Sequence, residues 1–110
     1  VTKVFKDAQK GEIVAVNDAS FTVEKGQLVT LLGPSGCGKT TVLKMIGGFE
    51  IPTRGSIYFD GILTNAVPPN KRNTSMVFQN YALFPRMTVF KNIAHGLTIQ
   101  KMRKDQMIER

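Results

Sequence analysis

The chain has 110 residues, of which 42% are hydrophobic, enough for one globular domain with a modest core. Its formal net charge is +7, which would suit attraction to phosphates, nucleic acid or anionic lipid, but the basic residues are spread along the chain, so a solvated surface is favoured. No apolar run approaches the roughly 20 residues of a membrane-spanning helix, and the N-terminus lacks the apolar stretch of a signal peptide. The only cysteine excludes an internal disulfide and fits a reducing compartment.

Strands and turns are predicted for the first third of the chain. Residues 1–5 are predicted to form a short strand, and the alternation within residues 11–26 favours antiparallel strands ending in a turn at 24–26. Residues 27–32, QLVTLL, are a compact apolar run that stops at Gly33, as a buried strand would.

A helix is predicted from Lys39, with apolar positions that suit packing on a sheet and a stop at the Gly47-Gly48 pair. The elements expected after it, in chain order, are a turn at 52–55, a strand at 56–59, a turn at 60–61, a loop at 68–72 and an apolar strand at 75–79. Pro85 breaks the next segment, Thr88 is expected to cap a helix that runs to residue 97, and Asp105 to cap another.

Residues 33–40, GPSGCGKT, match GxxxxGK[ST], the phosphate-binding P-loop, between an apolar run and a helix. The glycines permit positive φ and let backbone N–H groups converge on an anion, which also faces the positive end of the helix. Lys39 is expected to reach the β- and γ-phosphates, and the Thr40 hydroxyl to bind Mg²⁺. Cys37 stands at a free position of the motif and is interpreted as having no catalytic part.

Two long stretches of the chain are GPSGCGKTTVLKMIGGFEIPTRGSIYFDG and KRNTSMVFQNYALFPRMTVFKNIAHGL. With them, nearly the whole chain resembles the ATP-binding subunit of ABC transporters, and the second stretch contains that family's Q-loop. The resemblance is closest to bacterial importers of sugars, polyamines or ferric iron. The fold implied is α/β, a partial P-loop NTPase core with an N-terminal antiparallel β subdomain. Residues 1–110 are then expected to be the N-terminal part of one ATP-binding domain, cut before its helical subdomain is complete.

The resemblance implies roles for further residues. Phe5 matches the aromatic residue that stacks on adenine, although Tyr or Trp is commoner there. Gln79 matches the Q-loop glutamine, which coordinates Mg²⁺ or orients the attacking water. His95 is in the wrong place for the family's catalytic histidine and is interpreted as a helical surface residue. The implied ATP-binding residues are Phe5, Gly33, Pro34, Ser35, Gly36, Cys37, Gly38, Lys39, Thr40 and Thr41; Lys39 and Gln79 are the implied catalytic residues, and Thr40 and Gln79 the implied metal ligands.

The implied function is ATP binding and hydrolysis that drives solute import. The Walker B acidic strand, its catalytic glutamate and the LSGGQ-like signature are not found in the sequence, so this chain alone is expected to bind ATP·Mg²⁺ but hardly to hydrolyse it. An alternative is a soluble ABC-type ATPase of DNA repair or translation. A GTPase lacks support, because no Asn-Lys-x-Asp string follows the loop.

The resemblance also implies partners. A second copy of the subunit completes the ATP site in this family, and membrane permease subunits would contact the segment 80–96. No specific nucleic acid is expected. The protein would be cytoplasmic and peripheral on the inner face of the cell membrane.

Overall fold

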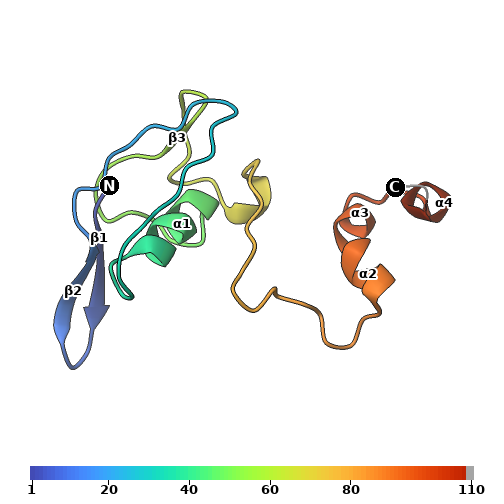
Figure 1. The fold of residues 1–110 in the computed structure, drawn as a ribbon, viewed down its shortest axis with the longest axis horizontal. Coiled ribbons are helices and arrows are strands. Elements are labelled where there is room, and N and C mark those ends of the chain that lie inside the picture. Colours follow the sequence, from blue (N-terminus) through green and yellow to red (C-terminus); the bar gives the residue numbers. More distant parts are fainter. Residues whose placement is uncertain (109–110) are drawn as a thin grey trace. The chain divides into compact units, whose positions relative to one another are not determined.

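A computed structural model describes residues 1–108. The chain forms two compact units, Val1–Met76 and Val77–Arg110. The first unit holds the strands and the longest helix, and the second holds three short helices (Figure 1).

The first unit begins with an antiparallel hairpin of β1 (Lys3–Asp7) and β2 (Gly11–Val16). The turn between them is closed by Asp7, whose Oδ1 accepts hydrogen bonds from the backbone N–H groups of Gln9 and Lys10, both over 2.8 Å. The strand predicted at the N-terminus and the first of the predicted antiparallel strands are thus confirmed.

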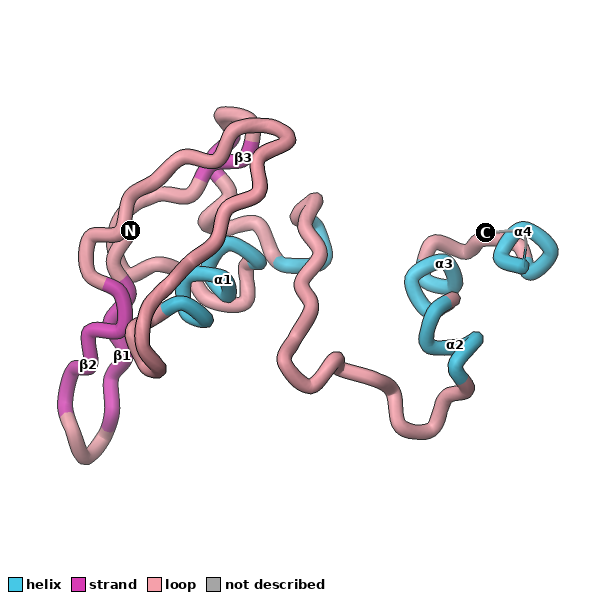
Figure 2. Tube along the Cα trace, viewed as in Figure 1, coloured by secondary structure: helices cyan, strands magenta, loops and turns pink. Residues whose placement is uncertain are grey.

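Two further strand predictions in this region are wrong. Residues 20–24 and 27–32 lie in one continuous loop between β2 and α1 (Figure 2), although the turn at 24–26 is present, with a hydrogen bond from Gln27 N–H to the carbonyl of Glu24. Residues 19–25 and 56–61 line a cavity of about 830 Å³, and none of the strand pairs found between residues 1 and 108 includes residues 19–25. A strand exists only where a neighbouring backbone pairs with it, and none of the described residues pairs along 27–32.

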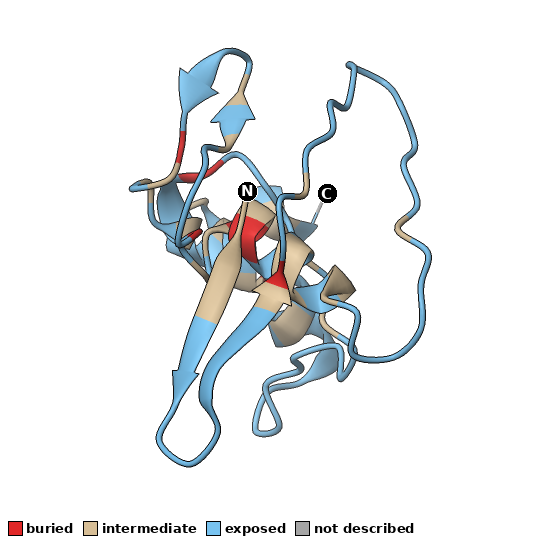
Figure 3. Cartoon of the chain, turned by 90° about the vertical axis from the view of Figure 1, so that its left-hand side faces the viewer, coloured by how far each residue is buried: buried red, intermediate tan, exposed pale blue. Residues whose placement is uncertain are grey.

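Helix α1 (Lys39–Gly47) follows the phosphate loop, as predicted. It ends at Gly48, which has φ 79° and donates its N–H to the carbonyls of Lys44 and Met45. Glycine accepts this left-handed cap at no steric cost. Met45 in α1 is fully buried, and Val16 at the end of β2 is 7% exposed. Figure 3 shows buried residues at α1 and at the adjacent end of β2, whereas the turn of the β1–β2 hairpin is exposed.

A second antiparallel hairpin is formed by two short strands, β3 (Tyr58–Phe59) and β4 (Ile62–Leu63), with a turn at residues 60–61. Both residues of its turn have positive φ, 49° at Asp60 and 77° at Gly61, as the predicted Asp-Gly turn requires. The predicted strand at 56–59 is therefore shorter than expected. After it come a 3₁₀ turn, η1 (Pro69–Lys71), and residues 75–79, which form no strand because no described backbone pairs with them.

The second unit contains α2 (Val89–Ile93), α3 (His95–Ile99) and α4 (Lys104–Ile108). Thr88 caps α2 as predicted, since its hydroxyl accepts the N–H of Lys91, but the helix breaks at Ala94 before α3 begins. Asp105 lies inside the first turn of α4 and pairs with Arg103 at 3.1 Å, so its predicted capping position is wrong. None of the helices described between residues 1 and 108 is long and apolar enough to cross a membrane.

Candidate functional site

The phosphate loop, residues 33–40, leads directly into the N-terminus of α1. Gly36 has φ 81° and Gly38 has φ 93°, two left-handed conformations in which a side chain would be strained. Between them Cys37 donates its N–H to the carbonyl of Pro34 over 3.4 Å. The glycines of the motif thus stand where the backbone turns sharply, and that turn brings successive amides toward the start of the helix.

The N-terminus of α1 has no side chain of its own that would compensate the positive end of the helix dipole. Gly38 is the N-cap and has no side chain to cap the helix, and no acidic residue stands in the first turn. The first amides of any helix lack partners within the helix and carry the positive end of its dipole. This end of α1 is therefore suited to an anion from outside the helix.

The side chain of Lys39 folds back over the loop. Its ammonium donates to the carbonyl of Gly33 over 2.7 Å and to that of Pro34 over 2.6 Å. A third bond reaches the Sγ of Cys37 at 3.3 Å. The positive charge is thus held against the loop by two carbonyls and a thiol.

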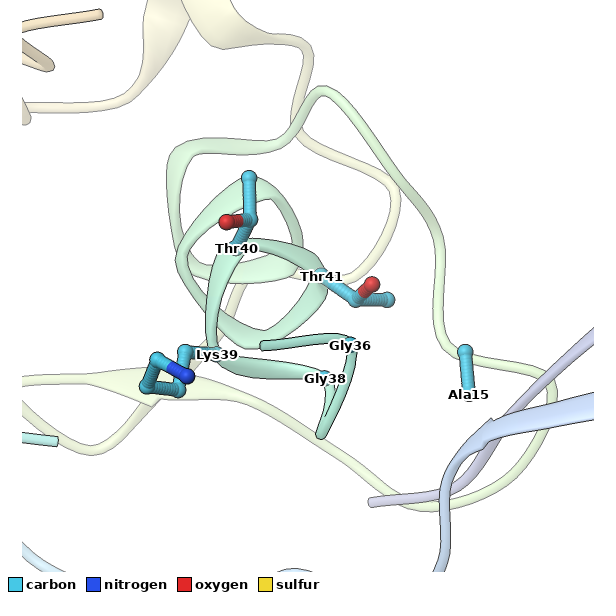
Figure 4. A pocket seen from close by; sticks show the side chains of 6 residues that line it. All are labelled: Ala15, Gly36, Gly38, Lys39, Thr40 and Thr41. Atoms are coloured by element: carbon cyan, nitrogen blue, oxygen red, sulfur yellow. The ribbon is translucent and has the colours of Figure 1, made fainter. Parts of the chain in front are cut away.

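A small cavity of about 150 Å³ lies at this helix end. It is lined by Ala15, Gly36, Gly38, Lys39, Thr40 and Thr41 (Figure 4). Pockets for whole small molecules usually measure roughly 300–1,000 Å³, so this cavity matches one part of a ligand, such as a phosphate group. The side chains of Thr40 and Thr41 point in different directions from the first turn of α1 (Figure 4), so their hydroxyls lie at different positions around the site.

Ala15 contributes to the candidate site, although no pattern in the sequence indicated it. Its carbonyl oxygen lies so close to Gly38 that a Cβ atom there would collide with it. Sequence patterns cannot indicate this contact, because it joins residues 23 positions apart through their backbones. The end of β2 therefore helps to determine where the loop enters the helix.

Phe5, the residue predicted to stack on adenine, lies on β1 opposite Ile13 and is 37% exposed. The ammonium of Lys3 lies over its ring, 4.9 Å from the centroid. Lys3 is itself held by Glu50 at 2.9 Å and by the carbonyl of Ile51 at 2.9 Å. One face of the Phe5 ring is thus engaged by a cation, and adenine stacking would use the other face.

Gln79 belongs to the second unit, whereas the phosphate loop belongs to the first. It is exposed and stands at a turn that Tyr81 closes by donating its N–H to the carbonyl of Phe78 over 2.9 Å. Tyr81 and Ala82 both have positive φ, 58° and 48°, which is uncommon for residues with side chains. The backbone after Gln79 is therefore strained, and the role of Gln79 itself stays a prediction.

The segment 80–96 is organised by Asn92. Its Oδ1 accepts the N–H of Phe84 over 2.9 Å, and its Nδ2 donates to the carbonyls of Phe84, Met87 and Thr88. The ring of His95 packs against that of Phe84, with centroids 4.4 Å apart. His95 is thus half-buried against an aromatic ring, a more structural position than the surface site that was predicted.

Large apolar side chains of this segment are exposed. Val89 is 77% exposed and Ile93 is 78% exposed. The others with substantial exposure are Tyr81, Leu83, Phe84, Met87 and Phe90. A run of this kind on one segment is typical of a surface that another protein covers.

Comparisons with known proteins agree with this arrangement. The family described as ABC transporter matches residues 16–110. The chain is 53% identical over 92 residues to the spermidine/putrescine import ATP-binding protein PotA of Clostridium novyi (strain NT), covering 84% of this chain and 26% of that protein. It is 52% identical over 102 residues to the Fe(3+) ions import ATP-binding protein FbpC 1 of Rhizobium meliloti (strain 1021), covering 93% of this chain and 29% of that protein.

A solved structure shares the fold. The ATP-binding cassette MJ0796, in a dimeric post-hydrolysis state bound to ADP and Pi, superposes with a TM-score of 0.85 at 31% sequence identity, covering 97% of this chain and 50% of that one. The chain thus spans half the length of this structure and less than a third of the two import proteins. Its fold is the α/β fold of the P-loop NTPases, with an antiparallel β hairpin at the N-terminus, and the chain belongs to the ABC transporter family.

Proposed function

We propose that this chain is the phosphate-binding part of the ATP-binding subunit of an ABC importer. The observation that carries the proposal is the bare N-terminus of α1, preceded by a glycine loop and flanked by the ammonium of Lys39. A tri- or diphosphate supplies the negative charge that this helix end lacks. Residues 1–110 form the N-terminal part of one such domain in this proposal.

The groups of the site would act on the nucleotide in different ways. The amides of Gly36 to Thr41 surround a phosphate, and Lys39 exchanges its bonds to loop carbonyls for bonds to the β- and γ-phosphates. Gly33, Pro34 and Ser35 shape the entry of the loop, and the thiol of Cys37 lies at its edge. Phe5 would stack on adenine with the face that Lys3 leaves open.

Mg²⁺ fits the residues at this site. No group of three or more His, Cys, Asp and Glu that could hold a metal occurs among the described residues, but Mg²⁺ on a nucleotide takes one or two protein ligands and fills the rest with phosphate and water. Thr40 is exposed in the first turn of α1 and offers a hydroxyl oxygen, and Gln79 would offer its amide oxygen. The ion would neutralise charge on the β- and γ-phosphates.

Hydrolysis is proposed for the whole protein. Lys39 would stabilise the charge that develops on the transferred phosphate, and Gln79 would orient the attacking water. The dimeric state of the solved relative supports a second copy of the subunit as the partner that completes the site. The 110-residue chain alone is expected to bind ATP and to hydrolyse it very slowly.

The exposed apolar side chains of segment 80–96 would contact a membrane permease. The names of the two relatives, both import ATP-binding proteins, favour this role over the alternative of a soluble ATPase of DNA repair or translation. The subunit would then be cytoplasmic and peripheral on the inner face of the membrane. No specific nucleic acid is required.

Binding of a fluorescent ATP analogue with Mg²⁺ tests the proposal. The unmodified chain should bind the analogue, and Lys39→Ala should weaken binding by at least about tenfold, since charge-assisted bonds to phosphate are lost. Lys44→Ala is the matched control, because Lys44 stands on the same helix near its other end and is exposed. Equal affinity of the Lys39→Ala variant and the unmodified chain would contradict the proposal.

A further inference from the structure

Arg72 is a buried cation in the first unit, only 7% exposed. All three nitrogen atoms of its side chain donate to backbone carbonyls. Nε donates to Val67 at 2.8 Å, Nη1 to Met45 at 2.8 Å and Ile46 at 2.7 Å, and Nη2 to Thr64 at 2.6 Å and Asn65 at 3.5 Å. No carboxylate is paired with it among the ion pairs of the described residues. Its charge is therefore compensated by the backbone alone.

Two of these carbonyls belong to the last turn of α1. The C-terminus of a helix carries the negative end of the dipole and unpaired carbonyls, so a cation there is stabilised. Burial lowers the pKa of the Arg72 guanidinium from its ordinary value, but an arginine side chain stays protonated in proteins. Arg72 thus acts as the cationic cap of α1, supplied from a distant part of the chain.

Gly48 leaves the space that this cap occupies. A Cβ atom on Gly48 would lie 2.6 Å from Nε of Arg72 and 2.9 Å from the central carbon of the guanidinium. The other carbonyls that Arg72 binds follow the β3–β4 hairpin. The guanidinium therefore joins the end of α1 to the segment after that hairpin in one fixed geometry.

The candidate phosphate site is at the opposite end of the same helix. Helix α1 has nine residues, which at 1.5 Å each make a rigid rod of about 13 Å. A displacement or tilt at its C-terminus moves Lys39 and Thr40 at its N-terminus. Binding sites tolerate displacements of only about 0.5 Å before contacts with the ligand are lost.

We propose that Arg72 is a positioning residue for the phosphate loop. By holding the C-terminus of α1, it fixes the place of the amides, Lys39 and Thr40 at the N-terminus. The inference rests on the proposed function, because it assigns to Arg72 a part in nucleotide binding without contact to the nucleotide. A merely structural role would instead stabilise the whole first unit evenly.

The test compares Arg72→Lys with Arg72→Met in the whole chain. Lysine keeps the charge but cannot bind five carbonyls in the planar geometry of the guanidinium, and methionine keeps only the volume. Arg54→Lys is the matched control, because Arg54 is exposed and its side chain has no hydrogen bond or ion pair among the described contacts. Helix content by circular dichroism, ATP affinity and hydrogen–deuterium exchange across residues 1–76, residues 36–41 included, are measured for each variant.

We expect Arg72→Lys to fold and to bind ATP about tenfold to a hundredfold more weakly than the unmodified chain. The increase in amide exchange caused by the substitution should be larger at residues 36–41 than in the rest of the first unit. Arg54→Lys should match the unmodified chain. Unchanged ATP affinity and loop exchange in Arg72→Lys, an even rise of exchange over residues 1–76, or loss of folding in both Arg72 variants would overturn the inference. Lack of ATP binding by the unmodified chain would overturn the proposed function instead, and the exchange of residues 36–41 would still decide the part of Arg72.

Discussion

The carbonyl oxygen of Ala15, at the end of β2, occupies the space that a Cβ atom on Gly38 would need. Gly38 also has φ 93°, so two independent constraints require glycine at the N-cap of α1. The entry of the phosphate loop into the helix is therefore determined by contact with a strand as well as by the motif.

Replacing Gly38 with alanine should displace the loop. The strained φ alone costs roughly 1–3 kcal/mol, and relief of the collision moves the start of α1 away from β2. We expect a lower thermal midpoint and at least about tenfold weaker ATP binding. Gly96→Ala is the control, since Gly96 lies within α3 with no atom near its would-be Cβ; it should gain roughly 0.5–1 kcal/mol in stability and leave ATP binding unchanged.

Alkylation of Cys37 should block nucleotide binding. The thiol is exposed, accepts a hydrogen bond from Lys39, and would lie 2.6 Å from a Cβ atom on Gly33, so the loop has little room for an added group. Treatment with N-ethylmaleimide is expected to weaken ATP binding strongly. The Cys37→Ser variant should bind ATP and be insensitive to the reagent. Unchanged ATP affinity of the fully alkylated chain would contradict the prediction that a group added at Cys37 blocks the phosphate loop.

Replacing Asn92 with alanine should loosen the turn at residues 84–88. Asn92 accepts one hydrogen bond from this turn and donates to three of its carbonyls, and each net bond contributes roughly 0.5–1.5 kcal/mol. We expect faster hydrogen–deuterium exchange of residues 84–88. Asn70→Ala is the control, because Asn70 is exposed on η1 with no side-chain hydrogen bond among the described residues. Equal exchange in both variants would show that Asn92 does not organise the segment.

The β1–β2 turn should depend on pH through Asp7. Hydrogen bonds from the backbone N–H of Lys10, and then of Gln9, lower the pKa of the Asp7 carboxyl below its ordinary value of 3.8. A lowered pKa means that the ionised carboxylate stabilises the folded turn; this contribution is complete above pH 3.8 and is lost as the pH falls through the folded pKa. Amide shifts of Gln9 and Lys10 in an NMR titration should follow that loss, and Asp7→Asn should remove it.

The 110-residue chain by itself should self-associate. Leu28 is 96% exposed and Leu32 is 89% exposed in the loop before the phosphate site, and exposed apolar surface favours association. Light scattering should report species larger than a monomer, and Leu28→Lys should reduce them. Thr30→Lys adds the same charge at an exposed polar position of that loop and should leave association unchanged. A monomer at every concentration would contradict this prediction.

Predictions from the sequence succeeded where the cause of the structure is local. The loop at 33–40, the start and stop of α1 at Lys39 and Gly47, and the Asp60-Gly61 turn all follow from residues that act on their own backbone. The Thr88 cap belongs to the same class, because its hydroxyl binds an amide three residues away. The strands at 27–32 and 75–79 failed because a strand needs a neighbouring backbone, and an apolar run contains no information about whether one is present.

By itself, the sequence determined the chemistry of the candidate site: a glycine loop, a lysine and a threonine at a helix N-terminus, in the spacing that phosphates require. Only the tertiary structure decided what holds that helix in place, namely Ala15 at one end and Arg72 at the other. The physical reason is the range of the interactions. The Thr88 cap and the tight turns are closed within a few residues. The close approach of Ala15 to Gly38, and the hydrogen bonds from Arg72 to the carbonyls of Met45 and Ile46, instead join segments that only folding brings together.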